Sequence, residues 1–243
     1  MSLTAHDLTA AEHFYGALLG WEFGSDGVDL GPYRRALVNG LPVAGLGEMP
    51  PGTGMPVDWI TYFAADNADE VAHRVRCSGG TVALGPLDSE TGAGRRAVAA
   101  DPDGAVFGIW ETQLYGGWGL QHQPGAAAWS ELETTGARRA GTFYQGVFGS
   151  SAVRSEAAGV RREQDLVVLT VAGRRVAGIR QVPRLRDRPH WRILFTVDSV
   201  DEVAANAAAL GGTVEQPPAD TPFGRMALLR DPQGAPFGVV AAD

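Results

Sequence analysis

"DPDGAVFGIW" (Asp101–Trp110) and "DPQGAPFGVV" (Asp231–Val240) are two versions of one phrase, 130 residues apart in a chain of 243. Each opens with Asp-Pro-x-Gly, in which proline presets the first turn residue and glycine accepts a positive φ at the exit. An apolar stretch follows, and a strand-like segment such as "RRAVAA" (Arg95–Ala100) precedes it. We therefore expect each phrase to form the tight turn and second strand of a β-hairpin.

Further pairs of segments repeat at nearly the same spacing. They are "FYGALLGW" (Phe14–Trp21) with "FYQGVFGS" (Phe143–Ser150), "VAGL" (Val43–Leu46) with "VAGI" (Val176–Ile179), "WITYFAADNADEVA" (Trp59–Ala72) with "WRILFTVDSVDEVA" (Trp191–Ala204), and "GGTV" at 79–82 and 211–214. This period is too long for a solenoid, whose repeats span roughly 20 to 50 residues. The sequence predicts a duplicated domain: a first copy at 1–115, a Gly- and Pro-rich linker at 116–128 and a second copy at 129–243.

Helix and strand signals follow the same order in both copies. Thr9 and Glu12 predict a capping box at the start of the first helix, and Gly20 predicts its end. Ser199 and Glu202 predict the same start for a helix late in the second copy. Short alternating segments between the helices predict strands. Each copy is thus expected to hold two strand–helix–three-strand units, which gives four βαβββ units in the whole chain.

Composition excludes several classes of protein. A net charge of −8 argues against a nucleic-acid partner, and no long apolar run or charged leader suggests a membrane segment or signal peptide. Cys77 is the one cysteine, so no internal disulfide forms, and we expect it to pack in the core of a protein of the reducing cytoplasm. All basic residues are arginine, which indicates a GC-rich bacterial genome and excludes Schiff-base chemistry on lysine.

The motifs in this order resemble those of the vicinal oxygen chelate superfamily, which includes glyoxalase I, extradiol dioxygenases and bleomycin-resistance proteins. The resemblance rests on "FYxxxxG" after a capped helix, on "VDSVDEVAANAAALGGTV", and on the closing "GRMALLRDPQGAPFGVV". It covers nearly all of both copies and is most similar to a two-domain bacterial subgroup described as hydroxylase-like. It implies an α+β fold in which paired βαβββ units curl mixed sheets around a cavity, with helices outside.

The resemblance also implies where a metal would bind. Metalloenzymes of the superfamily hold one divalent ion through His and Glu side chains on four strands. The corresponding positions here are Trp129 (in the first copy this position would precede Met1), Glu48 and Gln181, Ile60 and Arg192, and Gly108 and Gly238. Few of these side chains ligate divalent ions. We therefore expect no metal and no cofactor, the alternative being a divalent ion held by atypical ligands such as Glu131, His190 or Gln181.

Strand alternation indicates what lines the expected cavity. In "WSELET" Trp129 and Glu131 share one face, and in "WRILFTV" Arg192 lies on the face opposite the apolar set that should meet a helix. The predicted ligand-binding residues are Trp129, Arg192, Trp110, Tyr62, Glu48 and Gln181. The alternatives are that the tryptophans serve packing, that Glu131 and Arg192 form a structural ion pair, and that His190 begins its strand in solvent.

Two functions remain open from the sequence. The first is a metal-independent protein, monomer or homodimer, that binds a small molecule as bleomycin-resistance proteins do. The second is an enzyme on a small organic metabolite, either a metal-free acid–base catalyst using Glu131 and His190 or an atypical-metal lyase, isomerase, dioxygenase or hydroxylase. The second copy has Glu131, His190 and Arg192 where the first has Ser2, Asp58 and Ile60. That asymmetry keeps the enzyme hypothesis open.

Overall fold

The computed structural model describes residues 1–24, 33–49, 57–88, 94–112, 120, 122–149, 158–163, 166–185 and 188–242. Within them the chain forms four successive βαβββ modules, as predicted. The modules are β1 (Ser2–Ala5), α1 (Leu8–Leu19), β2 (Glu22–Gly24), β3 (Tyr33–Val38), β4 (Leu41–Glu48); β5 (Asp58–Ile60) and β6 (Tyr62–Ala64), α2 (Ala68–Cys77), β7 (Thr81–Asp88), β8 (Gly94–Ala100), β9 (Val106–Thr112); β10 (Ala127–Thr134), α3 (Ala137–Phe148), β11 (Ala158–Glu163), β12 (Leu166–Val171), β13 (Arg174–Gln181); and β14 (His190–Val197), α4 (Val200–Ala209), β15 (Thr213–Thr221), β16 (Gly224–Arg230), β17 (Pro236–Ala241).

The described chain folds into two compact units, and each unit combines both halves of the sequence. Unit 1 consists of Met1–Ile60, Trp118–Ala128 and Arg192–Asp243, and unit 2 of Thr61–Gly117 and Trp129–Trp191. Unit 1 therefore joins the first and fourth modules together with β5, and unit 2 joins the rest of the second module to the third. The boundaries at 1–115, 116–128 and 129–243 stay a prediction about the duplicated sequence. Residues 116–119 and 121 of the predicted linker lie outside the described residues.

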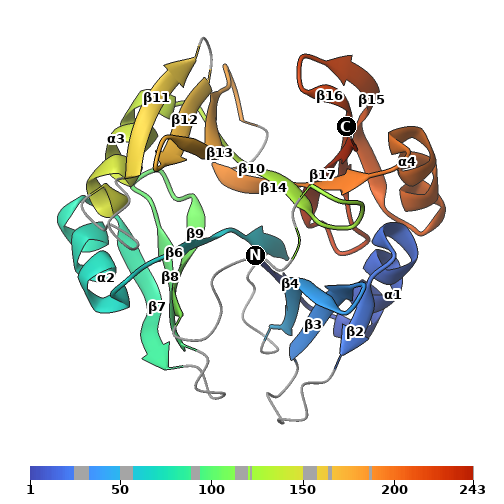
Figure 1. The fold of residues 1–243 in the computed structure, drawn as a ribbon, viewed down its shortest axis with the longest axis horizontal. Helices are drawn as coiled ribbons and strands as arrows, with labels where there is room; N and C mark the ends of the chain where they lie inside the picture. Colours follow the sequence, from blue (N-terminus) through green and yellow to red (C-terminus); the bar gives the residue numbers. More distant parts are fainter. Residues whose placement is uncertain are drawn as a thin grey trace. The chain divides into compact units, whose positions relative to one another are not determined.

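The sheets have the same topology in both units. In unit 1 the strand orders are β2-β3-β4-β1-β5 and β14-β17-β16-β15. In unit 2 they are β6-β9-β8-β7 and β11-β12-β13-β10. Each module pairs its first strand in parallel with its last one, namely β1 with β4, β6 with β9, β10 with β13 and β14 with β17. Helices α1 and α4 cover one face of the strands of unit 1, and α2 and α3 cover one face of those of unit 2 (Figure 1). We call the opposite face of each sheet its open face.

The repeated phrases form hairpins as expected. Residues 101–105 connect β8 to β9, and 231–235 connect β16 to β17, both antiparallel pairs. The backbone N–H of Gly104 donates to the carbonyl of Asp101 at 3.0 Å, and Gly104 has φ +91°. Gly234 makes the same bond at 3.0 Å, with φ +98°. Glycine is needed at both positions because other residues rarely adopt such a φ.

The start of the first helix differs from the prediction. Asp7, not Thr9, is the N-cap of α1, because its side chain accepts a hydrogen bond from the Ala10 N–H at 2.9 Å. Glu12 is consequently inside the helix and pairs with Arg34 at 3.1 Å. The predicted end is confirmed, since Gly20 has φ +68° and its N–H bonds the Gly16 carbonyl.

The other two helix predictions have opposite outcomes. Ser199 caps α4 by accepting from the Glu202 N–H, which confirms the expected start. Cys77 was expected in the core and is exposed instead. The buried residues of α2 include Val71 and Val75, so a residue two positions after Val75 points away from the core. The thiol of Cys77 lies 3.5 Å from Nε2 of His73, one turn earlier on the same exposed surface.

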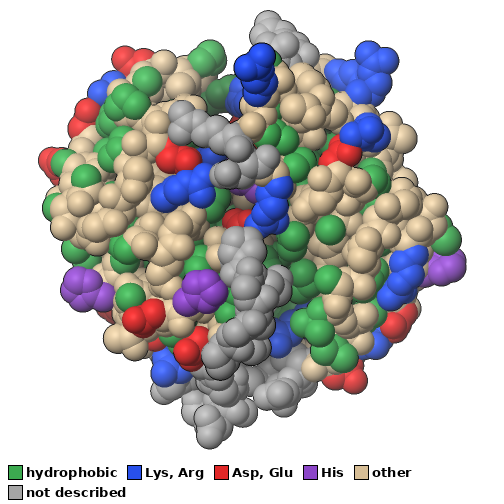
Figure 2. Space-filling view, turned by 180° about the vertical axis from the view of Figure 1, so that it is seen from behind, with side chains coloured by type: hydrophobic (Ala, Val, Ile, Leu, Met, Phe, Trp, Pro, Cys, Tyr) green, Lys and Arg blue, Asp and Glu red, His purple; other side chains and the backbone are tan. Residues whose placement is uncertain are grey.

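Two further observations concern the helices and the surface. None of the described helices combines the length and the apolar character that crossing a bilayer requires. On the face drawn in Figure 2, basic side chains are scattered among acidic ones and do not gather into one basic area.

A buried Trp–Tyr–Asp network lies in unit 1. Nε1 of Trp59 donates to the hydroxyl of Tyr15 at 3.0 Å, and that hydroxyl donates to Oδ2 of Asp231 at 3.1 Å. Trp59, Tyr15 and Asp231 are at most 3 % exposed. The other carboxylate oxygen, Oδ1, accepts from the N–H groups of Gln233 and Ala235, both at 2.9 Å. The same carboxylate thus shapes the hairpin turn and closes the core network.

Unit 2 contains the corresponding network. Nε1 of Trp191 donates to the Tyr144 hydroxyl at 2.9 Å, and this hydroxyl is 3.5 Å from Oδ2 of Asp101. In both units the tyrosine of the "FY" segment meets the aspartate of a turn from the other half of the sequence. Each network therefore joins the "FY" motif of one half of the sequence to the Asp-Pro-x-Gly turn of the other half.

Burial shifts the pKa of the carboxyl and hydroxyl groups in both networks. It raises the pKa of the Asp231 and Asp101 carboxyls, although backbone N–H donors partly oppose the effect. It also raises the pKa of the Tyr15 and Tyr144 hydroxyls well above their usual value. The tyrosines therefore stay neutral donors at physiological pH.

We expect Tyr15→Phe to lower the free energy of unfolding by about 1–3 kcal/mol, because it leaves the Trp59 N–H and the Asp231 carboxylate without their buried partner. Tyr144→Phe removes the same hydroxyl from unit 2, where the bond to aspartate is longer, and should cost less. Urea unfolding of the two variants measures both values. Equal stability of Tyr15→Phe and wild type would contradict the stated role of the network.

The raised carboxyl pKa gives a pH dependence of known sign. Because the pKa of Asp231 is higher in the folded state than in the unfolded one, folding is favoured by protonation of this group. Its contribution to stability therefore increases as the pH falls from 7 through its folded pKa toward the unfolded one. Asn does not titrate, so the advantage of wild type over Asp231→Asn should widen in this direction. Unfolding curves of both proteins across this range test the sign, and a narrowing difference would refute it.

Candidate functional site

The open face of the sheet that contains β10 carries two of the predicted site residues, Trp129 and Glu131. Leu132 is fully buried in the core under the helices. Because successive side chains of a strand point to opposite faces, the residues directly before and after Leu132 point away from the helices. Trp129, Glu131 and Glu133 consequently lie on the open face, as the alternation of "WSELET" predicted. All three are partly buried.

The strand register completes this face, which belongs wholly to unit 2. Glu131 pairs with Gly178 and Glu133 with Arg180, while Val168 lies next to Gly178 on the other side. We call the set the Trp129 face and define it by the open-face residues of the four strands: Trp129, Glu131, Glu133, Gly159, Arg161, Glu163, Leu166, Val168, Thr170, Arg175, Gly178 and Arg180.

Trp129 lies low over its sheet. A Cβ atom on Gly178 would be 3.1 Å from Nε1 and 3.2 Å from Cζ2 of the indole, and 3.0 Å from a methyl carbon of Leu166. The glycine therefore makes room for the ring. The guanidinium carbon of Arg175 is 5.7 Å from the centroid of the Trp129 ring, a cation–π distance.

Two sets of ion pairs border this ring. Arg180 binds both carboxylate oxygens of Glu131, at 2.5 and 2.9 Å. Glu163 lies 3.1 Å from Arg175 and 3.3 Å from Arg161. The partner of Glu131 is therefore Arg180 and not Arg192, the partner considered from the sequence. Alternation in "RRVAGIRQ" puts Arg180 on the face of Gly178, but only the register of β10 and β13 brings it near Glu131.

Tyr62 and Trp110 share the open face of the other sheet of unit 2. Tyr62 pairs with Gly108 between parallel strands β6 and β9, and Trp110 follows two residues later. A Cβ on Gly108 would overlap the Tyr62 ring, far inside the 3.0 Å that real Cβ contacts keep. In unit 1 Gly238 pairs with Leu194 in the same way. The strand glycines of the two repeated phrases thus make room for side chains of the neighbouring strand.

The tryptophans of the described residues fall into two groups. Trp21, Trp59 and Trp191 are buried, and each donates its indole N–H to a buried acceptor. Trp110 and Trp129 are half-buried on open faces, and in the described part of the chain their indole N–H groups have no hydrogen-bond acceptor. The first group is structural, whereas the second has a polar edge available for another molecule.

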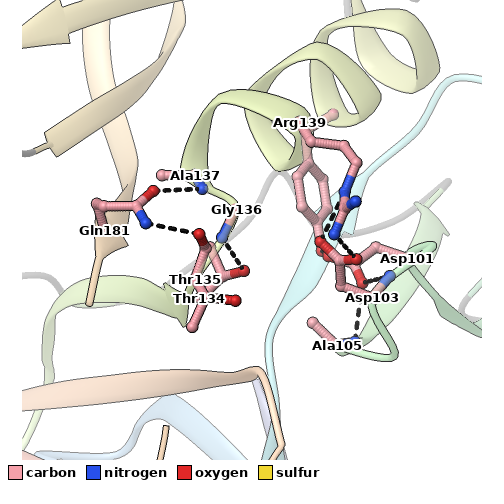
Figure 3. Close-up of polar contacts among 10 residues, drawn as sticks. Asp101, Asp103, Ala105, Thr134, Thr135, Gly136, Ala137, Arg139 and Gln181 are labelled. Atoms are coloured by element: carbon pink, nitrogen blue, oxygen red, sulfur yellow. Dashed lines mark hydrogen bonds and ion pairs between the residues drawn. The ribbon is translucent and has the colours of Figure 1, made fainter. Parts of the chain in front are cut away.

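Gln181 has a structural position. Its Oε1 accepts from the Ala137 N–H at 2.9 Å and its Nε2 donates to the Thr135 carbonyl at 2.6 Å, so it caps the start of α3 (Figure 3). The N-cap residue Gly136 has no side chain to do this. Glu48, its counterpart in the first copy, is exposed at the end of β4. It follows the core residue Leu46 by two positions, so the two side chains share one face of the strand. It therefore lies on the helix-covered face of its sheet.

Arg192 lies in unit 1 and is 5 % exposed. It donates to Glu215 at 3.0 Å, and Arg230 donates to the other oxygen of that carboxylate at 2.6 Å. Burial opposes ionisation of Glu215, but the hydrogen bonds from Arg230 and Arg192 outweigh it and lower its pKa. Arg192 is thus held in a buried ion-pair network with partners that the sequence analysis did not name.

His190 begins β14 and is partly buried. Its Nδ1 lies 3.1 Å from the carbonyl oxygen of Arg188. The bidentate partner of Glu131 is Arg180.

The sequence pattern of the glyoxalase-like domain matches residues 129–240. Over 99 % of this chain and 92 % of its own length, "Putative glyoxylase CFP32" of Mycobacterium tuberculosis (strain CDC 1551 / Oshkosh) is 39 % identical. This chain belongs to the glyoxalase-like proteins of the vicinal oxygen chelate superfamily. "Anthracycline biosynthesis protein DnrV" of Streptomyces peucetius is 36 % identical over 98 % of this chain and 90 % of its own length.

Solved structures with this fold include enzymes of two kinds. The Mn(II)-bound glyoxalase from Novosphingobium aromaticivorans has a TM-score of 0.64 at 18 % identity, over 99 % of this chain and 80 % of that one. The 2,3-dioxygenase LapB from Pseudomonas sp. KL28 has a TM-score of 0.63 at 15 % identity, over 99 % of this chain and 90 % of that one. At such identities the likeness concerns the fold of this glyoxalase-like protein.

Three of the positions that the resemblance assigns to metal ligands have other contacts here. Gly108 lies under the Tyr62 ring, Gln181 caps a helix, and Arg192 is paired with Glu215. Within the described ranges, no three His, Cys, Asp or Glu side chains are close enough together to hold a metal ion. The described side chains at these positions do not make up a His and Glu ligand set.

We expect Gly108→Ala to lower the free energy of unfolding by about 1–3 kcal/mol, because the new methyl group would displace the Tyr62 ring. In a Tyr62→Ala background the same change should cost much less. Gly238→Ala is the matched control, since its nearest atoms are flexible leucine carbons at 3.1 and 3.2 Å. Chemical unfolding of wild type, Gly108→Ala, Tyr62→Ala and the double variant gives the coupling energy. Additive effects at Gly108 and Tyr62 would show that the ring does not require the glycine.

Proposed function

We propose that this protein binds a small organic molecule without the divalent metal used by metalloenzymes of its superfamily. The observation that carries the proposal is the Tyr62 ring over Gly108, because a metal-binding carboxylate does not fit at that position without moving the ring. The capping role of Gln181 and the ion pair of Arg192 support it, since these side chains already have structural partners.

Binding is favoured over proton transfer by the state of Glu131. Both of its carboxylate oxygens accept from Arg180, which leaves a general base little access to a substrate proton. The neighbouring Trp129 offers an aromatic surface and a polar N–H edge, the combination typical of small-molecule sites. The name of the relative DnrV mentions anthracycline biosynthesis, and by analogy we infer a ligand of natural-product type.

Catalysis is the second candidate, and the glyoxylase name of the relative CFP32 favours it. In that case Glu131 and His190 would be the acid–base residues, and ligand binding would have to release Glu131 from Arg180. Both functions are compatible with a cytoplasmic protein that is a monomer or a homodimer. The exposed thiol of Cys77 is consistent with a reducing compartment.

Native mass spectrometry of protein purified without chelator tests the proposal. We expect a chain with either no added mass or the mass of an organic molecule, and no transition-metal ion. Trp129→Leu should lose any organic passenger, while Phe223→Leu, which changes an exposed aromatic side chain of unit 1 in the same way, serves as the matched control. One metal ion per chain would overturn the metal-free proposal and direct mutagenesis to Glu131 and His190.

A further inference from the structure

We propose that the ligand is a planar aromatic molecule without net charge, stacked on the Trp129 indole between the Arg180–Glu131 pair and the Arg175–Glu163 pair. This rests on the proposed binding function and names the ligand class. Every residue that carries it belongs to unit 2.

The floor of the site is flat and apolar. Gly178 has no side chain, so the Trp129 ring lies close to the strand, and Leu166 packs beside it. Leu166 and Val168 are 7 and 0 % exposed although they are on the open face, away from the helices, so other side chains already cover them and the surface left for a ligand is the indole itself. A flat aromatic molecule gains both stacking on this ring and apolar contact with it. An aliphatic molecule of similar size gains only the contact.

The position of Arg175 indicates that a planar group fits over the Trp129 indole. Its guanidinium, itself planar, is already placed over the indole, 5.7 Å from the ring centroid. The side chain is 40 % exposed and its ion pair with Glu163 is near the surface. Such a pair contributes little to stability, so a ligand that displaces Arg175 from the ring gives up little. Arg175 then remains beside the ligand as a hydrogen-bond donor for carbonyl or hydroxyl groups at its edge.

The charges of the Trp129 face indicate the charge of the ligand. The face has three arginines, at 161, 175 and 180, and three glutamates, at 131, 133 and 163, so its positive and negative charges balance. Glu131 is engaged by Arg180, and Glu163 lies between Arg175 and Arg161. An anionic ligand would compete with these carboxylates for their arginines and leave a carboxylate without its partner. The balance therefore favours an uncharged molecule with hydrogen-bonding groups at its rim.

Equilibrium dialysis with two probes of one ring system tests this. The probes are 1,4-dihydroxyanthraquinone, which is uncharged, and anthraquinone-2-sulfonate, which is an anion. The full-length protein should bind the uncharged probe at least about tenfold more tightly, and Trp129→Leu should weaken that binding about tenfold or more, as loss of a stacking platform implies. Phe223→Leu, at an exposed aromatic residue of unit 1, should leave it unchanged.

A charge variant tests the electrostatic part separately. Glu163→Gln keeps the size of the side chain and gives the face an excess positive charge, so it should narrow the preference for the uncharged probe. Tighter binding of the sulfonate by wild type, or no effect of Glu163→Gln on the ratio, would overturn the charge argument and with it the ligand class.

Failure of this inference is distinguishable from failure of the binding function. If neither probe binds but an organic passenger is lost specifically from Trp129→Leu, the Trp129 face is a binding site and the ligand class is wrong. If Trp129→Leu retains both the probes and any passenger, the Trp129 face is not the site, and this inference falls. One metal ion per chain refutes the metal-free function by itself.

Discussion

The hydrogen bond between a buried tyrosine and the carboxylate of a hairpin turn is the constraint on which each unit depends. In unit 1 the Asp231 carboxylate accepts from Tyr15 and from two N–H groups of its own turn. The turn is therefore fixed to the helix that carries Tyr15, and the Trp59 indole is fixed to the same hydroxyl. Because a buried carboxylate without donors is costly, turn, helix and strand hold their relative positions together.

Sequence reasoning succeeded where a signal is local. The Asp-Pro-x-Gly turns, the glycine that ends α1 and the serine that begins α4 each depend on residues within a few positions of one another. It failed at the start of α1, where Asp7 and Thr9 are both good caps. The choice is made from far away, since the Gln233 side chain accepts from the Asp7 N–H at 2.8 Å and donates to its carbonyl at 2.8 Å.

The candidate site shows the same division. The face on which Trp129 and Glu131 lie followed from alternation along one strand. The partner of Glu131 did not, because pairing Glu131 with Arg180 requires the parallel register of β10 and β13, which depends on packing across the sheet. The reason for the glycine at 108 was equally non-local: it is the Tyr62 ring on a strand more than forty positions earlier. Alternation gives the face of a side chain, whereas the register gives its neighbours.

The exchange of aspartates between the halves has a genetic consequence. All residues of the first copy can be present and correct, and the core of unit 1 is still incomplete until Asp231 has been synthesised. A frameshift or stop codon shortly before that turn removes a small part of the chain, yet it leaves the Tyr15 hydroxyl without its acceptor. For the same reason, the tyrosine of one copy and the turn aspartate of the other cannot change independently in evolution. They meet in one core, so a substitution in either copy alters a core that also contains residues of the other copy.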